Sequence, residues 1–164
     1  MTLLQICEWL ESTQLAELVT QSLYGFQIVV AVHLMGLGLS VGTVIWFDLR
    51  LLGKVLQTTP VSEVYRRLAP WMLAGFTMMF GSGAVIFVGF ATAAYANPYF
   101  RVKLAVIALA GVNAALFHFF TQRRLAGWDA WAYPPAAARI AGAVSIASWI
   151  VVVLAGRMMS YTMF

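Results

Sequence analysis

Four long stretches of this chain contain no aspartate, glutamate, lysine or arginine, and this pattern constrains the fold more than any other feature. They cover residues 18–47, 68–100, 104–122 and 140–156. About 20 apolar residues are enough for a helix to cross a bilayer. We therefore expect an all-α integral membrane protein: one transmembrane domain over residues 1–164, an up-down four-helix bundle with spans near 20–50, 68–96, 99–123 and 137–162.

The composition excludes the soluble classes. Hydrophobic residues make up 62% of the chain and charged residues 10%, whereas a soluble domain is roughly 45–50% apolar and about 25% charged. The one cysteine, Cys7, excludes a disulfide-stapled secreted domain. In a membrane protein a net charge of +4 reports loop orientation. It therefore predicts no nucleic-acid partner.

The N-terminal segment differs from a secretory signal peptide, because its first twenty residues carry three glutamates and no lysine or arginine. Its apolar side chains share one helical face: Leu3, Leu4, Cys7 and Leu10. An amphipathic helix of this kind lies in the membrane interface. We expect a short interfacial helix that ends at Ser12 and Thr13.

The basic residues predict the orientation. Seven of the ten lie in two loops, with Arg50, Lys54, Arg66 and Arg67 in the first and Arg123, Arg124 and Arg139 in the third. Cytoplasmic loops of membrane proteins are enriched in lysine and arginine. We expect a multi-pass protein of the bacterial inner membrane with both termini on the periplasmic side.

Both histidines of the chain, His33 and His118, fall inside uncharged spans. Ionisable residues within a membrane are candidates for function, and imidazole is the usual axial ligand of membrane haem. Each histidine could instead donate one hydrogen bond between helices. The presence of both inside the membrane favours metal ligation.

Small residues flank each histidine at helical spacing. His33 shares a face with Gly36, Leu37 and Ser40, and His118 shares one with Gly111, Ala114 and Ala115. We expect the first and third helices to run in opposite directions and these bare faces to hold a haem b between them. Small faces also allow membrane helices to pack closely, which is the competing interpretation. The histidines differ in expected depth by about 13 Å, so one shared iron requires helix tilt. The alternatives are a separate haem for each histidine, or only one histidine as a ligand.

Cations near the outer helix ends are candidates for binding the haem propionates. Lys103 and Arg157 lie just inside those ends, with Arg101 nearby, and Tyr161 lies one turn beyond Arg157. Snorkelling of these cations toward lipid headgroups is the alternative.

Other polar and sulfur-containing residues suggest weaker possibilities. Asp48 and Arg50 could pair with each other or with Arg66 and Arg67 as a structural anchor. Asn113 fits a hydrogen bond between helices. Methionines near His33 and in two Met-Met pairs suggest copper, because thioethers are soft ligands, but methionine is also ordinary core filling.

The chain resembles a bacterial family of uncharacterised four-helix membrane proteins along its whole length. The resemblance rests on Val32-His33-Leu34-Met35-Gly36-Leu37, Asp48-Leu49-Arg50-Leu51-Leu52-Gly53, Ala110-Gly111-x-Asn113, Phe117-His118, and Gly156-Arg157 with Tyr161. More remotely, the spacing of a first-helix histidine, a basic residue opening the third helix and a histidine ending it is similar to HemJ-type protoporphyrinogen oxidases and to the membrane domain of CopD-type copper-resistance proteins. The HemJ-type resemblance implies His33 as haem ligand and Lys103 as a second essential group. The sequence Asp48-Leu49-Arg50 departs from that family and weakens the case for porphyrinogen oxidation.

We therefore expect a b-type haem protein that passes electrons between the quinol pool and an outward-facing redox partner. The expected partners are the lipid bilayer and other membrane or periplasmic redox subunits, and the chain could form a homo-oligomer. A cofactor-free structural subunit of a larger complex and a copper-handling protein are the alternatives. Whether the protein turns over a substrate stays open.

Overall fold

The computed structural model describes residues 2–121 and 127–163, and this part of the chain is helical without strands. Four of its helices are long and apolar enough to cross a membrane, so the chain is a multi-pass membrane protein. The elements in order are α1 (Leu3–Glu11), α2 (Gln14–Thr20), α3 (Gly25–Leu51), α4 (Val61–Gly89), α5 (Ala91–Ala96), α6 (Pro98–Leu116), the π-helical turn η1 (Phe117–Thr121) and α7 (Ala136–Met163).

The boundaries differ from the expected spans mainly at α4. This helix begins at Val61 rather than near residue 68, because Glu63 in its first turn pairs with Arg66 and Arg67 and keeps the charged residues helical. It ends at Gly89, and the following residues form the separate helix α5.

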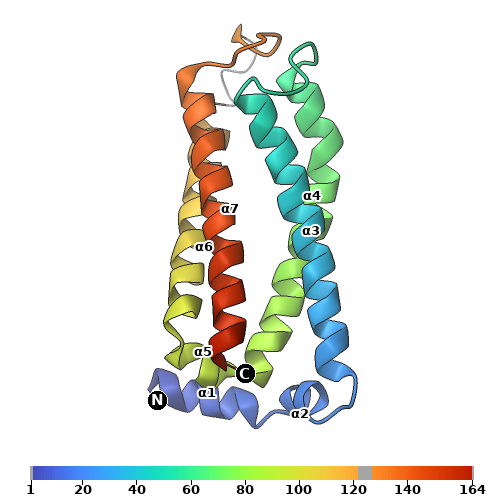
Figure 1. Ribbon diagram of the computed structural model, residues 1–164, viewed down its shortest axis with the longest axis vertical. Helices are drawn as coiled ribbons and strands as arrows, with labels where there is room; N and C mark the ends of the chain where they lie inside the picture. The colour runs from blue at the N-terminus through green and yellow to red at the C-terminus, as the bar shows by residue number, and fades with distance from the viewer. Residues whose placement is uncertain (1, 122–126, 164) are drawn as a thin grey trace.

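The four long helices form two hairpins (Figure 1). Helix α3 packs along α4, α6 packs along α7, and contact between α3 and α7 joins the two hairpins. The loops after α3 and after η1 lie at one end, called here the loop end, and α1, α2, α5 and the C-terminus lie at the other, called the terminal end. Helices α3 and α6 both run from the terminal end to the loop end, so the expectation that they run in opposite directions is wrong. The reason is that each crossing reverses the direction of the chain, and one span, α4, lies between α3 and α6.

Backbone contact makes the α3–α4 interface close. A Cβ at position 36 would lie 2.6 Å from Met79 N, and a Cβ at position 75 would lie 2.4 Å from Ser40 N. Ser40 is fully buried and donates to Gly36 O at 2.7 Å. Small side chains therefore let these two helices approach more closely than larger ones would.

Arg50 ties the loop end together. Its side chain is fully buried, with Nε donating to Thr59 O at 2.9 Å and Nη2 donating to Trp131 O at 3.0 Å. Asp129 accepts from Ser62 N and Oγ at the start of α4. These bonds connect the loop between α3 and α4 to the segment that precedes α7.

The short helices cover the terminal end (Figure 1). The Glu11 carboxylate at the end of α1 accepts from Thr92 N and Oγ1 at 2.8 Å, which fixes α1 against α5. Asn97 caps α6 through Tyr99 N and donates to Thr162 Oγ1 at 2.8 Å. The sequence predicted α1 but not α2, which begins where Thr13 supplies a new N-cap.

Candidate functional site

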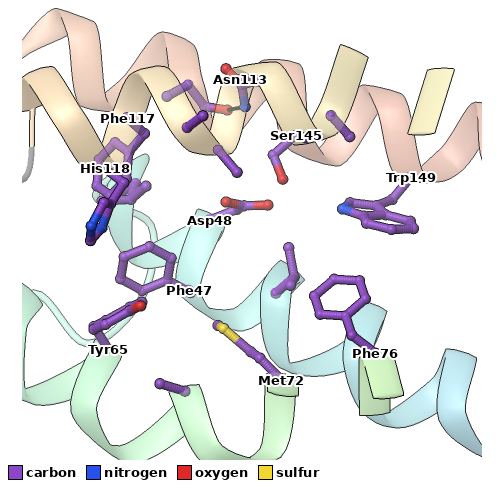
Figure 2. Close-up of a pocket in the computed structure, with 18 of the residues that line it drawn as sticks. Phe47, Asp48, Tyr65, Met72, Phe76, Asn113, Phe117, His118, Ser145 and Trp149 are labelled. Carbon is purple, nitrogen blue, oxygen red and sulfur yellow. Dashed lines mark hydrogen bonds between the residues drawn. The ribbon is translucent and has the colours of Figure 1, made fainter. Parts of the chain in front are cut away.

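A cavity of about 610 Å³ lies between the two hairpins in the half of the molecule nearer the loop end. A volume of this size falls within the range of small-molecule sites, about 300–1,000 Å³. Aromatic side chains form much of its wall: Phe47, Tyr65, Phe76, Phe117 and Trp149. The cavity is also lined by four polar residues: Asp48, Asn113, His118 and Ser145 (Figure 2).

The cavity opens sideways, toward the surface that would face lipid. Among the described residues α4 and α6 have no interface comparable to those of the other neighbouring spans. Leu73, Phe80 and Phe119 line the cavity and are exposed by 70%, 51% and 52%. An apolar molecule dissolved in the bilayer could therefore enter between α4 and α6.

Asp48 is the buried acidic group of this cavity. Its residue is 4% exposed, its carboxyl points into the space between the hairpins, and the Ser145 hydroxyl of α7 lies beside it (Figure 2). Its Oδ2 atom is buried and has no hydrogen-bond partner. The expected pairing with Arg50 is not formed, because the described ion pairs join Glu63 to Arg66 and Arg67 only.

The face predicted on the third helix does line the cavity. Gly111, Ala114 and Ala115 of α6 lie on its wall, followed by His118 in η1. Asn113 lies on the same wall and donates to Ala141 O at 2.9 Å, which agrees with its expected role between helices. A π-helical segment shifts the side chains that follow it around the helix and is often found at functional sites.

The face predicted on the first helix, in contrast, packs against α4. Gly36 and Ser40 meet the α4 backbone at Met79 and Gly75. The structure therefore places these two residues in the packing of α3 against α4. The reason is that Gly75 of α4 presents an equally small surface at the same level.

His33 lies nearer the terminal end and is half-buried. Its Nδ1 atom is 3.1 Å from Ser82 Oγ, and a Cβ at position 83 would lie 3.1 Å from its Cε1 atom. Ser82 therefore fixes the direction of the ring, and Gly83 provides the space in which it lies.

Lys103 of α6 is half-buried at the same end. Its ammonium acts electrostatically on the His33 ring, and its Nζ would be 3.6 Å from a Cβ at position 156. The lysine side chain thus lies against α7 at Gly156. Two residues that the sequence predicted for a site, His33 and Lys103, therefore lie in the same part of the molecule.

His33 and His118 belong to different halves of the molecule. Lys103, which acts on His33, precedes His118 by fifteen residues on α6 and η1, or about 22 Å at the helical rise. Val41, Met79, Trp149 and Val152 form an apolar cluster between the two levels. The geometry therefore gives each histidine its own surroundings and does not place both on one metal ion.

The remaining candidates lie near the surface of the terminal end. Arg157 donates to Tyr161 Oη at 2.9 Å and lies over its ring, and both residues are exposed. Arg101 donates to Tyr95 O and is exposed. For copper, Met35 is 65% exposed and points away from the side of α3 on which His33 meets Ser82. Within residues 2–121 and 127–163, no three histidine, cysteine, aspartate or glutamate residues form a cluster.

Two residues that sequence reasoning missed belong to these sites, Ser82 beside His33 and Ser145 beside Asp48. Both are hydroxyl residues inside charge-free spans, and that was the only signal available. Serine also bonds to its own helix backbone in membrane spans, as Ser82 does to Met78 O. The signal was therefore too common to single them out.

Comparison with known proteins supports the resemblance to an uncharacterised family. A model described as a family of unknown function, DUF6644, matches residues 6–162. No curated protein and no solved structure matches the chain. The remote similarity to HemJ-type and CopD-type proteins stays a prediction.

Proposed function

The chain belongs to the DUF6644 family, and from this premise we propose that it is a haem b protein of the bacterial inner membrane that transfers electrons between the quinol pool and a redox partner outside. The observation that carries the proposal is the arrangement of His33, Ser82 and Lys103 at one level of the molecule. In this proposal the fold is an up-down bundle, the loop end is cytoplasmic and α1 lies at the outer interface.

His33 would hold the haem iron. Histidines that bind metals usually make a hydrogen bond through the other ring nitrogen, which sets the tautomer and the ring orientation. The contact between His33 Nδ1 and Ser82 Oγ is of this kind. It leaves Nε2 as the atom that would bind iron.

Lys103 would balance one haem propionate. Its half-buried ammonium has no carboxylate among its described contacts, and a charge in low-dielectric surroundings needs an opposite charge. The lysine lies against α7 at Gly156, whereas Arg157 is already engaged by Tyr161 at the surface. When bound, the haem would supply one-electron transfer near the outer side of the membrane.

Visible absorption spectra of purified variants test the proposal. Detergent-purified protein, produced with ample haem, should show the reducible Soret and alpha bands of non-covalent haem b, since the chain has no Cys-x-x-Cys-His. His33→Ala should lose these bands, and His118→Ala, the matched control at the other end, should keep them. Absence of haem from the parental protein, or its retention in His33→Ala, would show that the proposal is wrong.

A cofactor-free structural subunit is the second candidate. The packing of Gly36 and Ser40 against α4 favours it, because a face expected to bind a cofactor serves helix association instead. A parental protein without haem that co-purifies with a larger complex would support this candidate.

A further inference from the structure

The carboxyl of Asp48 is incompletely satisfied. A buried polar atom without a hydrogen bond is costly, and natural proteins leave few such atoms. Oδ2 is one of two buried side-chain atoms without a partner in the described part of the chain. Asp48 lines the cavity but Oδ2 itself is covered, so a turn of the carboxyl toward the cavity would bring this oxygen to a donor on a bound molecule.

The rest of the cavity restricts the kind of molecule. The wall is mainly aromatic and aliphatic, and it opens between two lipid-facing helices, so the cavity suits an apolar molecule that is soluble in the bilayer. The described lining includes no lysine or arginine. A haem is a poor fit here, since its two propionates would lie beside a carboxyl without a cation.

Polar groups on different walls suggest two oxygen atoms on the ring. Asp48 and Ser145 meet on one side, and His118 lies across the cavity from them (Figure 2). A 1,4-dihydroxy ring presents hydroxyls at opposite positions, and a hydroxyl both donates and accepts.

We propose that this cavity is a quinol-binding site in which one ring hydroxyl donates to Asp48 Oδ2, Ser145 supports the same carboxyl, and the lipid tail leaves between α4 and α6. This proposal rests on the proposed function in one respect, since it names the site at which that function would meet the quinol pool. The haem and the quinol would occupy different halves of the molecule, separated by the apolar cluster around Met79 and Trp149.

Calorimetric titration of the purified protein in detergent tests the site. The probe is a benzoquinol with a ten-carbon tail, and the matched control ligand is its dimethyl ether, which has no donor. The parental protein should bind the quinol at least about tenfold more tightly than the ether, as expected for a hydrogen bond to a carboxyl group. Equal binding of the two ligands would overturn the proposal.

Variants locate the binding. Asp48→Leu should lose the preference for quinol over ether, and Ser145→Ala should reduce it. Ser148→Ala is the control, because Ser148 is buried one turn further along α7 and does not line the cavity. If Asp48→Leu does not fold, the comparison of Ser145→Ala with Ser148→Ala tests whether the quinol binds beside Asp48. Equal quinol preference in Ser145→Ala and Ser148→Ala would overturn the assignment.

Two further measurements separate this proposal from its rivals. His33→Ala should bind the quinol as tightly as the parental protein does, and this holds even if the haem proposal fails. Loss of quinol binding in His33→Ala would overturn the location of the quinol in this cavity. A decylamine probe tests a cationic ligand. Asp48-dependent binding of the amine that is tighter than that of the quinol would overturn the assignment to quinols.

Discussion

Two glycines on α3 provide a sharp test of how the hairpins are held together. A Cβ at position 36 would meet Met79 N at 2.6 Å and Gly75 O at 3.0 Å, whereas a Cβ at position 38 would meet nothing within 4 Å. Both residues lie within the same helix, so Gly36→Ala and Gly38→Ala gain similar helix propensity, about 1 kcal/mol. The difference between the two variants therefore isolates the contact with α4.

The size of that difference follows from what the new methyl group would touch. Overpacking a well-packed interior costs about 1–3 kcal/mol, and contact with backbone atoms cannot be relieved by a change of rotamer. We expect Gly36→Ala to unfold with a free energy about 2–3 kcal/mol lower than that of Gly38→Ala. Gly38→Ala should be as stable as the parental protein or slightly more stable.

Equilibrium unfolding in mixed detergent micelles, followed by circular dichroism as the fraction of dodecyl sulfate rises, measures this difference. The protein should be produced both with and without haem supplementation. The interface predicts the same difference in both preparations, because the contact of Gly36 with the α4 backbone exists without a cofactor. Equal stability of the two variants would refute the packing argument. A difference found only in the haem-supplemented preparation would show that Gly36 belongs to the cofactor site.

Two further predictions concern the loop end and the orientation. Arg50→Lys should lower the free energy of unfolding by about 2 kcal/mol, because an ammonium cannot replace both guanidinium bonds to backbone carbonyls. Lys54→Arg, at an exposed position, is the control in the same unfolding measurement. Equal stability of Arg50→Lys and Lys54→Arg would contradict the role of Arg50. In a Cys7→Ala background, Thr58→Cys at the loop end should be shielded from an impermeant thiol reagent in intact cells and Ser22→Cys at the terminal end should be labelled; the reverse pattern would invert the orientation.

The long helices were predictable from the sequence, because the absence of charge over twenty residues is a strong signal for a membrane span. The short helices and the start of α4 depend on local capping and ion pairs. Thr13 looked like a helix breaker and is in fact the N-cap of α2. Glu63 looked like part of a polar loop and in fact begins α4 by pairing with two arginines.

The candidate sites were predictable only in part, because residue spacing does not identify the neighbour that covers a helix face. Gly36 and Gly111 carried the same sequence signal. Gly75 of α4 packs against the helix face that contains Gly36. No residue of α4 fills the space beside Gly111, and Gly111 therefore lines the cavity. The partnership of His33 with Lys103 also needed the structure, since seventy residues separate them in the chain.

Asp48 and Arg50 show how position on a helix separates charges that are close in sequence. Residues two apart point about 200° away from each other around a helix, so Asp48 faces the cavity while Arg50 faces the loops. The arginine meets two backbone carbonyls that the loops supply. The carboxyl meets one serine, and its second oxygen stays without a partner. A purely structural role would be served as well by an uncharged residue at position 48, because replacing a buried charge by an apolar group is often neutral or stabilising. If Asp48→Leu is at least as stable as the parental protein and has lost its preference for the quinol, the carboxyl is retained for its ligand and not for the fold.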